Sequence, residues 1–396
     1  MIRSINDVSF YQKTALIRVD YNVPLGKDQS IADDLRIQNT LPTLDKIIDD
    51  GGIPVLMSHL GRPKGEFSPE FSLRPVADYL ANYYGYDVIF AEDCVGEKAE
   101  TAVEEAVIGQ VVVLENLRFH PEEKKNDEEF AKKLAKLGDV YVNDAFGSAH
   151  RAHASTDAVA RLFEKRYAGY LMIDEIEYLG NTVSDPGHPF VAVMGGAKIS
   201  GKIDVIKNLI SKCDSILIGG GMMYTFYKAM DLEIGKSLLE EDKIELAKEL
   251  IEKAKNESCE LLLPLDTIVA DKFDNEANFK TVKDSEIPAD WLGVDIGAET
   301  RTLFTDTITK AKTVVWNGPM GVFEMPNFAS GTLSIAEALA TATEKGAITI
   351  IGGGDSAAAI RQMNFQNKVT HVSTGGGASL EYLEGKTLPG IAALDC

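Results

Sequence analysis

The sequence predicts an α/β fold with two Rossmann-like lobes, each a parallel sheet covered by helices on both faces, joined by a helix and hinge. Short, continuously apolar runs recur along the chain, and segments with helical periodicity separate them. Strands that are buried on both faces and alternate with helices are typical of parallel sheets. The chain has 396 residues, more than one hydrophobic core usually organises, which favours two domains.

The expected strands end in glycine or in polar residues. In the first half they are TALIRVD (14–20), IPVLMSHLG (53–61), QVVVLENLR (110–118) and DVYVNDAFG (139–147). In the second half they are FVAVMGG (190–196), SILIGGG (215–221), CELLLP (259–264), TVVWNGPMG (313–321), ITIIGGG (348–354) and THVSTGGG (370–377). Amphipathic helices are expected at 128–138 and 239–256. Ligands of open α/β sheets bind at the carboxyl ends of the strands, so site residues are expected there.

The boundary between the lobes is predicted near residues 170–188. The segment YLMIDEIEYLGNTV (170–183) predicts a helix, and SDPGHP (184–189) predicts a turn that ends it. We therefore expect a first lobe over 1–170, a connecting helix over 171–187 and a second lobe over 188–383.

Composition and charge exclude several classes of protein. The net charge of −21 argues against a nucleic-acid partner, because phosphate backbones require basic surfaces. The N-terminus has no apolar signal-peptide core, and no apolar stretch is long enough for a membrane span. The four cysteines are scattered without a CxxC pair. We therefore expect neither a disulfide framework nor a zinc site, and a reducing, cytoplasmic location.

Cationic and polar side chains gather at the strand ends of the first half. Nine of the eleven arginines precede residue 170. Guanidinium groups bind carboxylate and phosphate in bidentate fashion, so this group predicts a pocket for a small polyanion. A surface ion pair is the alternative for any single arginine. The residues in question are Asp20, Asn22, Arg36, His59, Arg62, Arg118, Asn143, Asp144 and Arg151.

Glycines take those places in the second half, at Gly195–Gly196, 219–221, 352–354 and 375–377. Glycine lets the backbone approach a ligand closely and turns N–H groups toward phosphate oxygens. The last residues of ITIIGGGD also open a helix, whose N-terminus favours anions. A tight strand-to-helix turn is the alternative for any one triplet, but the repetition favours a nucleotide cleft.

The segment GAKISGK (196–202) fits the GxxxxGK part of a Walker A loop. Ile203 follows where a magnesium-binding Ser or Thr would stand, so it is not a true P-loop. Lys198 and Lys202 remain candidates to meet phosphates. Asp355 follows the glycine triplet and is a candidate Mg²⁺ ligand, because a carboxylate beside phosphates needs a bridging cation. Its alternative is the N-cap of the following helix, and the two roles are compatible.

His150 and His153 lie in AHRAHAST (149–156). Their spacing allows a metal pair, but no third ligand is apparent in the sequence. A structural or substrate-proximal role is the preferred interpretation.

The motifs together resemble those of phosphoglycerate kinases, over nearly the whole chain and in the same order. They are RVDYNVPL (18–25), SHLGRP (58–63), LENLRF (114–119), NDAFGSAHRAHAST (143–156), MGGAKISGKI (194–203), VVWNGPMGVFE (314–324), GGGDSA (352–357) and VSTGGGASLE (372–381). Two departures are small: Ser356 and Ser148 stand where threonine is usual or common.

The resemblance implies reversible transfer of the acyl phosphate of 1,3-bisphosphoglycerate to Mg-ADP, giving 3-phosphoglycerate and ATP, in a monomer that bends at a hinge. It implies a substrate-binding first lobe, onto which residues near 384–396 return, and a nucleotide-binding second lobe. The implied substrate residues are Asp20, Asn22, Arg36, His59, Arg62, Arg118 and Arg151. The implied adenosine residues are Gly196, Ala197, Gly220, Gly293, Pro319 and Val322, with Glu324 at the ribose. Those facing phosphates and metal are Lys198, Lys202, Asn317, Gly353, Gly354, Asp355 and Ser356.

Catalysis is expected to depend on Arg36, Lys198 and backbone N–H groups near Gly376, which would stabilise the phosphoryl group in a direct transfer. Two other classes stay open at this point. A nicotinamide-dependent dehydrogenase is disfavoured because no GxGxxG fingerprint with a ribose-binding acid follows a strand. A two-lobed anion-binding protein would bind phosphate without ATP turnover.

Overall fold

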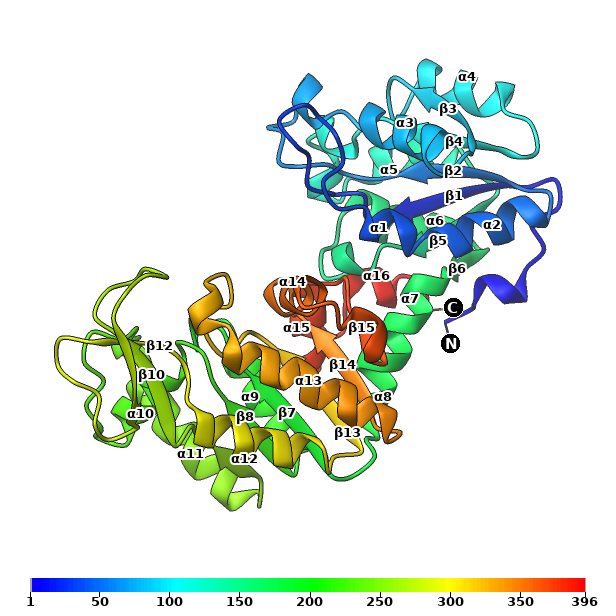
Figure 1. The fold of residues 1–396 in the computed structure, drawn as a ribbon. Helices are drawn as coiled ribbons and strands as arrows, with labels where there is room; N and C mark the ends of the chain where they lie inside the picture. The colour runs from blue at the N-terminus through cyan, green and yellow to red at the C-terminus, as the bar shows by residue number, and fades with distance from the viewer. Residues whose placement is uncertain (1, 396) are drawn as a thin grey trace. The chain divides into compact units, whose positions relative to one another are not determined.

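Two parallel six-stranded sheets organise the chain, one in each of two structural units (Figure 1). The structure, a computed structural model, describes residues 2–395. The first unit comprises the chain up to Ile176 together with the residues from Thr387 onward, and the second comprises Glu177–Lys386. The predicted fold class, two α/β lobes with parallel sheets, is confirmed.

The first sheet has the strand order β3-β4-β2-β1-β5-β6, and every neighbouring pair is parallel. The central strands are almost entirely buried, as their continuous apolar sequences require. The sequence analysis did not predict β3 and β6. The strands are β1 (Thr14–Val19), β2 (Ile53–Met57), β3 (Asp87–Ala91), β4 (Gln110–Leu114), β5 (Val140–Asp144) and β6 (Arg166–Ala168).

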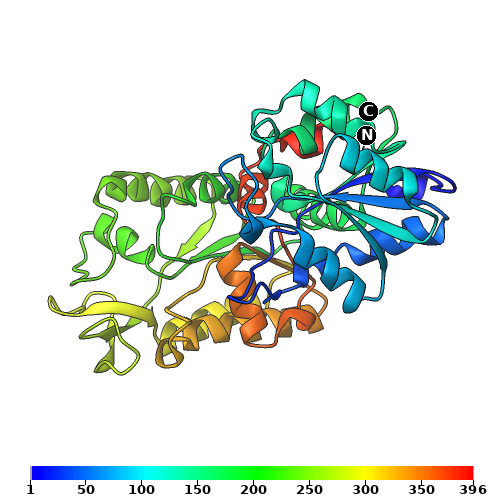
Figure 2. The ribbon, with the colours of Figure 1, turned by 90° about the horizontal axis from the view of Figure 1, so that it is seen from above.

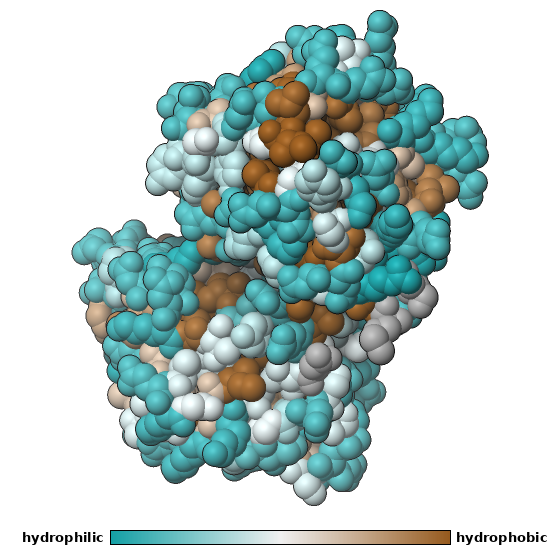
Figure 3. All heavy atoms as spheres, turned by 90° about the vertical axis from the view of Figure 1, so that its right-hand side faces the viewer, coloured by the Kyte–Doolittle hydropathy of each residue, from teal (hydrophilic) through white to brown (hydrophobic). Residues whose placement is uncertain are grey.

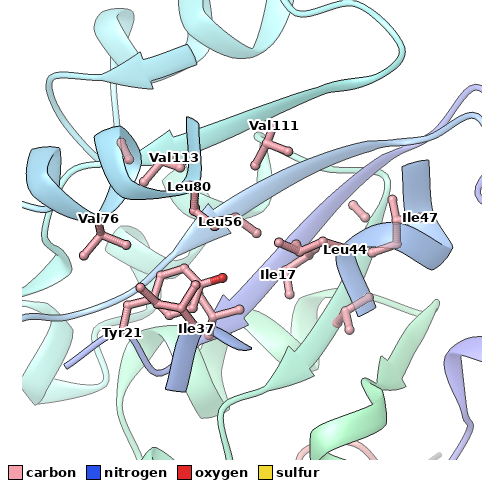
Figure 4. Close-up of a cluster of buried hydrophobic side chains, with 14 of the residues drawn as sticks. Ile17, Tyr21, Ile37, Leu44, Ile47, Leu56, Val76, Leu80, Val111 and Val113 are labelled. Carbon is pink, nitrogen blue, oxygen red and sulfur yellow. The ribbon is translucent and has the colours of Figure 1, made fainter. Parts of the chain in front are cut away.

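Helices cover this sheet because each turns one apolar stripe inward. Figure 4 shows Val76 and Leu80 over Leu56 of β2, with Leu44 and Ile47 over Ile17 of β1. Truncating one such fully buried leucine to alanine typically costs about 2–5 kcal/mol. The helices of this unit are α1 (Leu35–Gln38), α2 (Leu41–Asp49), α3 (Arg74–Asn82), α4 (Glu97–Glu105), α5 (Glu128–Ala135), α6 (Val159–Leu162), α7 (Tyr170–Glu175) and α16 (Pro389–Ala392).

The second sheet has the order β15-β14-β13-β7-β8-β9 and is also parallel throughout. Its strands are β7 (Phe190–Met194), β8 (Ser215–Ile218), β9 (Glu260–Leu262), β13 (Thr313–Asn317), β14 (Ile348–Gly352) and β15 (His371–Val372). The helices of this unit are α8 (Thr182–Ser184), α9 (Ile203–Ile210), α10 (Met223–Ala229), α11 (Ile244–Asn256), α12 (Ala298–Ile308), α13 (Ser330–Glu344), α14 (Gly354–Gln362) and α15 (Gly377–Leu383).

A small antiparallel sheet that the sequence analysis did not predict belongs to the second unit. It has the order β11-β10-β12, with β10 (Asp266–Ala270), β11 (Phe279–Lys283) and β12 (Leu292–Ile296). Figure 2 shows it in yellow at one end of the unit. β11 is mostly exposed and polar, so it has no apolar run that would identify it as a strand.

The segment between the units is helical, as predicted for 170–183. α7 continues into a π-helical stretch, Ile176–Asn181, and then into α8. Gly169 is the N-cap of α7, and the buried Asp144 of β5 accepts a hydrogen bond from the backbone N–H of Met172 at 3.1 Å. The same helical segment therefore starts on the first sheet and ends in the second unit.

The last residues of the chain pack in the first unit. Asn143 Nδ2 donates to the carbonyl of Gly390 at 3.2 Å, and the N–H of Gly390 donates to the carbonyl of Ala149 at 2.8 Å. A Cβ on Gly390 would approach Cα of Ala149 to 2.9 Å, so this contact requires glycine.

Hydrophilic residues cover most of the face drawn in Figure 3, with apolar patches between them. Within residues 2–395, none of the helices combines the length and the apolarity that crossing a bilayer requires.

Candidate functional site

Three side chains lie together at the carboxyl ends of β1 and β2: the acidic Asp20 and the basic Arg36 and His59. Arg36 Nη1 lies 2.8 Å from Asp20 Oδ2, and His59 Nδ1 lies 3.9 Å from Asp20 Oδ1. Burial alone would raise the pKa of Asp20, but Arg36, followed by His59 and Arg18, lowers it to about 2. Asp20 is therefore a fixed negative charge that orients the cations around it.

Arg18 connects these groups and was missed by the sequence analysis. It is 1% exposed; its Nε donates to Ser155 Oγ at 2.8 Å, and its Nη2 to Ser148 Oγ at 3.3 Å. Nη2 also lies 3.1 Å from His59 Nδ1. A charged residue inside the apolar run TALIRVD was the available signal, since arginine is almost never fully buried without partners.

The contact with Arg18 determines which ring nitrogen of His59 carries the proton. A guanidinium can only donate, so Nδ1 of His59 must accept and the ring proton lies on Nε2. Burial lowers the pKa of His59 well below its ordinary value, and Arg18 and Arg118 add to this while Asp20 opposes it. His59 is thus a neutral hydrogen-bond donor through Nε2.

Arg118 and Asn22 are both held by the backbone of Gly61. Arg118 Nη1 donates to the carbonyl of Gly61 at 2.7 Å, and the N–H of Gly61 donates to Asn22 Oδ1 at 2.9 Å. Burial, with Arg18 and Arg151 nearby, lowers the pKa of Arg118 to about 10. Its buried Nε has no hydrogen-bond partner among the described residues, which suits a donor that awaits an anion.

Arg62 and Arg151 are the exposed members of the predicted set. Arg151 Nε donates to His150 Nε2 at 3.0 Å and is close enough to Arg118 to affect its charge. His153 Nδ1 lies 3.8 Å from the buried carboxylate of Glu123, and burial with Arg18 lowers the pKa of His153 to about 4. The structure therefore brings most of the predicted anion-binding residues together, but no hydrogen bond or ion pair within residues 2–395 links Arg62, Asn143 or Asp144 to them; Asn143 instead binds Gly390, and Asp144 binds the N–H of Met172.

The second unit contains a cavity of about 540 Å³ at the carboxyl ends of its strands. Eight predicted nucleotide residues line it: Gly196, Ala197, Gly220, Gly293, Pro319, Val322, Glu324 and Asp355. The wall also includes apolar side chains that the sequence analysis did not identify, among them Tyr224, Leu238, Phe273 and Leu292. They lie outside the glycine motifs, so no local signal marked them. An apolar slot with few polar groups is typical of sites for flat ligands such as a nucleotide base.

Two of the lining glycines are required by sterics. Gly220 has φ +66°, and a Cβ there would lie 2.5 Å from the backbone nitrogen of Gly196. A Cβ on Gly293 would lie 1.5 Å from Tyr224 Oη. Because each glycine has only a hydrogen in place of a side chain, the neighbouring backbone can pass close by and the cavity stays open.

Lys202 and Asn317 lie together at the ends of β7 and β13. Lys202 Nζ donates to the carbonyls of Gly195 at 2.6 Å and Asn317 at 2.9 Å, and burial lowers the pKa of Lys202 to about 8 although Asp355 opposes this. Asn317 Nδ2 is buried, has no hydrogen-bond partner among residues 2–395 and lies 3.0 Å from where a Cβ of Gly353 would stand. A phosphate oxygen near Gly353 would satisfy that donor.

The remaining phosphate candidates surround the start of α14. Its N-cap is Gly353, so the alternative that Asp355 is the N-cap is wrong; Asp355 lies in the first turn, exposed beside the cavity. Ser356 Oγ accepts from the N–H of Gly318 at 2.5 Å and thus orders the turn after β13. An exposed carboxylate next to a nucleotide-sized cavity fits a Mg²⁺ ligand.

Lys198 and Gly376 complete the predicted residues. Lys198 is exposed in the glycine-rich turn after β7, and Gly376, with φ +52°, is the N-cap of α15. Neither lines the cavity described above, among the residues that the structure covers.

A cationic anion-binding cluster on one parallel sheet and a glycine-lined cavity on another define a two-domain α/β phosphotransferase. The family model described as "Phosphoglycerate kinase" matches residues 5–386. The chain belongs to the phosphoglycerate kinase family, and its activity is that of a phosphoglycerate kinase. The dehydrogenase and non-catalytic alternatives are thereby excluded.

Relatives match over the full length. The chain is 57% identical over 392 residues to a phosphoglycerate kinase of Chloroherpeton thalassium, covering 99% of this chain and 98% of that one. It is 53% identical over 393 residues to the enzyme of Chlorobium limicola, covering 99% of each. The solved structure of phosphoglycerate kinase from Coxiella burnetii matches with a TM-score of 0.90 at 39% identity, covering 100% of this chain and 99% of that one. The structure from Pyrococcus horikoshii gives 0.85 at 32%, covering 100% and 98%.

Proposed function

We propose that the protein transfers the acyl phosphate of 1,3-bisphosphoglycerate reversibly to Mg-ADP, giving 3-phosphoglycerate and ATP in glycolysis. The observation that carries this assignment is the chemical difference between the units. The first gathers Arg36, His59 and Arg118 around Asp20, while the second offers a cavity lined by glycine and apolar side chains. Such a pairing suits a small acid on one lobe and a nucleotide on the other.

The substrate side consists of Asp20, Asn22, Arg36, His59, Arg62, Arg118 and Arg151, on a lobe of residues 1–170 with the C-terminal segment. Arg118 Nε supports this role, because it is a buried donor without a partner among the described residues. His59 binds as a neutral donor, so it adds specificity without adding charge. Arg36 lies on α1, where its ion pair with Asp20 orients it.

The nucleotide side, on residues 188–383, uses the cavity for the base and ribose. Lys198, Lys202, Asn317, Gly353, Gly354 and Ser356 bind phosphates, and Asp355 holds Mg²⁺. The orphaned Asn317 Nδ2 beside Gly353 supports this placement of the phosphates. When bound, Mg²⁺ would neutralise charge on the phosphate oxygens.

Transfer is direct and in line, without a phosphoenzyme. Arg36, Lys198 and the backbone N–H groups near Gly376 stabilise the charge on the moving group. The lobes close about the connecting helix, 171–187, when both ligands are bound, and closure excludes water. Small-angle scattering with each ligand alone and with both tests this, and superimposable curves would contradict closure.

We further propose that the enzyme acts as a cytoplasmic monomer without a nucleic-acid or membrane partner. The net charge of −21 supports the absence of these two partners, because it repels phosphate backbones and anionic lipid surfaces. Light scattering of the purified protein measures its mass, and a stable dimer would contradict the monomer.

A coupled assay of ATP- and Mg²⁺-dependent phosphorylation of 3-phosphoglycerate tests the reaction. Glycerate, which lacks the phosphate that the arginines would bind, is the matched control substrate. Turnover of 3-phosphoglycerate but not of glycerate is the expected result. Equal turnover of both would contradict the substrate assignment, and ATP hydrolysis without acceptor phosphorylation would contradict the reaction.

A further inference from the structure

A second cavity, of about 640 Å³, lies in the first unit and has no role in the proposed reaction. Its lining includes Asp93 and His120, together with the charged side chains of Arg74, Glu92, Lys98 and Glu115. Cys94, which follows the lining residue Asp93 in the chain, is buried, and one ligand atom each from Asp93, Cys94 and His120 lie within 4.8 Å of one another.

Sheet topology creates this cluster. β3 and β4 are parallel neighbours whose last residues, Ala91 and Leu114, are paired. The segments that leave the two strands therefore begin side by side. The first carries Asp93 and Cys94, and the second carries a short helical turn, Leu117–Phe119, that ends at His120.

The three side chains are already partly arranged as a set. His120 Nε2 lies 2.7 Å from Asp93 Oδ1, which also accepts from the N–H of Cys94 at 2.7 Å. Phe130 packs against the His120 ring, with centroids 5.2 Å apart. The Cys94 side chain is 0% exposed, and no hydrogen bond of its thiol is found within residues 2–395. The buried thiol thus lies close to an imidazole and a carboxylate, which together are three possible ligands for one ion.

From this geometry we propose that Asp93, Cys94 and His120 form a binding site for one thiophilic divalent cation of the Zn²⁺ type. Sulfur, imidazole and carboxylate are ligands of Zn²⁺, whereas Mg²⁺ prefers oxygen alone. Bonds of about 2.0–2.3 Å place tetrahedral ligand atoms roughly 3.5 Å apart, so an ion would separate His120 Nε2 from Asp93 Oδ1, now 2.7 Å apart, and would draw in any ligand atom that lies farther away. Because Asp93 and His120 line the cavity, water could reach the ion from that side.

The surrounding charges permit a dication. Glu115 accepts from Ser72 Oγ at 2.6 Å and from the N–H of Leu73 at 2.8 Å, so its carboxyl oxygens are already occupied and lie outside the ligand set. Lys98 is paired with Glu92 at 2.9 Å. The Arg74 guanidinium lies 4.1 Å from the centroid of the Phe90 ring. The lining acids thus outnumber the lysine and arginine by one.

The raised pKa of the Cys94 thiol opposes metal binding, so binding should strengthen as the pH rises. Burial favours the protonated form of Asp93, but hydrogen bonds from His120 and from the N–H of Cys94 outweigh it and lower the pKa of Asp93. Burial, followed by Asp93 and Glu123, raises the pKa of Cys94, so binding replaces the thiol proton with the metal and releases that proton to solvent. The expectation of no zinc site rested on spacing along the chain, which does not reveal ligands joined through neighbouring strands.

Cobalt titration of the reduced full-length protein tests the site. Co²⁺ bound to a thiolate absorbs in the near ultraviolet, and Zn²⁺ should displace it while excess Mg²⁺ should not. The expected result is one equivalent bound. His120→Gln, Asp93→Asn and Cys94→Ser should each weaken binding by roughly 10-fold or more, at least the loss that removal of an outer-shell partner causes.

Two controls make the result specific. His188 lies 2.6 Å from Asp214, much as His120 lies 2.7 Å from Asp93, but among residues 2–395 this pair belongs to no group of three possible ligands, so His188→Gln should leave binding unchanged. Cys259→Ser, at another buried thiol, should also leave it unchanged. Wild-type protein without thiolate absorption, or undiminished absorption in Cys94→Ser, overturns the proposal. Should Cys94→Ser not fold, His120→Gln and Asp93→Asn, both at partly exposed positions, decide the question.

Discussion

The guanidinium of Arg36 lies 2.8 Å from the carboxylate of Asp20, although Arg36 is also the residue proposed to stabilise the transferred phosphoryl group. The pair orients Arg36 before any ligand arrives. Asp20 has a pKa of about 2 against an ordinary 3.8 because Arg36, followed by His59 and Arg18, outweighs burial. A lowered acid pKa stabilises the fold above the ordinary value and loses this effect as the pH falls through the folded value.

Asp20→Asn should therefore lower the free energy of unfolding by about 2 kcal/mol at pH 7, from the size of the pKa shift. The deficit should shrink as the pH falls from 4 toward 2. Urea unfolding at pH 7, 4 and 3 measures it, with Asp49→Asn, at an exposed position, as the control. A deficit that does not change with pH would show that the ion pair is not its cause.

Lys198→Ala should reduce kcat by roughly 100- to 1,000-fold, the usual loss when one preorganised donor to the transition state is removed. The KM values for both substrates should change little, because Lys198 acts on the transferred group. Lys207→Ala, an exposed lysine on α9, is the matched control and should keep wild-type turnover. Near-normal kcat in Lys198→Ala would remove that residue from catalysis.

Gly220→Ala should cost more stability than Gly346→Ala and should also weaken Mg-ADP binding. Both glycines have positive φ, +66° and +89°, so both substitutions carry a backbone penalty of about 1–2 kcal/mol. Only at Gly220 does the new Cβ meet backbone atoms, whereas nothing lies within 4 Å at Gly346. Urea unfolding and nucleotide titration compare the two, and equal costs would contradict the close packing of the cavity wall.

Nucleotide binding should take up protons near pH 8.5. Burial lowers the pKa of Lys202 to about 8, so this lysine is largely neutral at pH 8.5. A bound phosphate raises that pKa again, and Lys202 then gains a proton. Calorimetry of Mg-ADP binding in buffers of different ionisation enthalpy measures the uptake. It should vanish in Lys202→Met and persist in Lys207→Met; uptake that persists in Lys202→Met would point to another group.

The sequence predicted the two sheets because ten of their strands have continuous apolar runs. β3 and β6 escaped because each begins with a charged residue, Asp87 or Arg166, and because β3 is only partly buried. β11 escaped because its pairing with β10 does not require an apolar sequence. The strand ends could be located because glycine or polar residues follow most of the apolar runs. Ligands of such sheets bind at these ends.

The site residues were predictable where chemistry is local, as in the glycine turns. They were not predictable where a side chain is held by residues from distant segments of the chain. Arg18 is held by Ser148 and Ser155, which lie more than a hundred residues away in the chain. Tyr224 became recognisable only through its fit against Gly293.

The hydrogen bonds from Gly390 to Asn143 and Ala149 have a consequence for biosynthesis. The final ten residues leave the ribosome after all of Glu177–Lys386 has been made, yet they complete the unit that is made first. Until then the amide of Asn143 and the carbonyl of Ala149 lack these partners. The nascent amino-terminal unit therefore lacks these native contacts until the segment that follows Lys386 has been made.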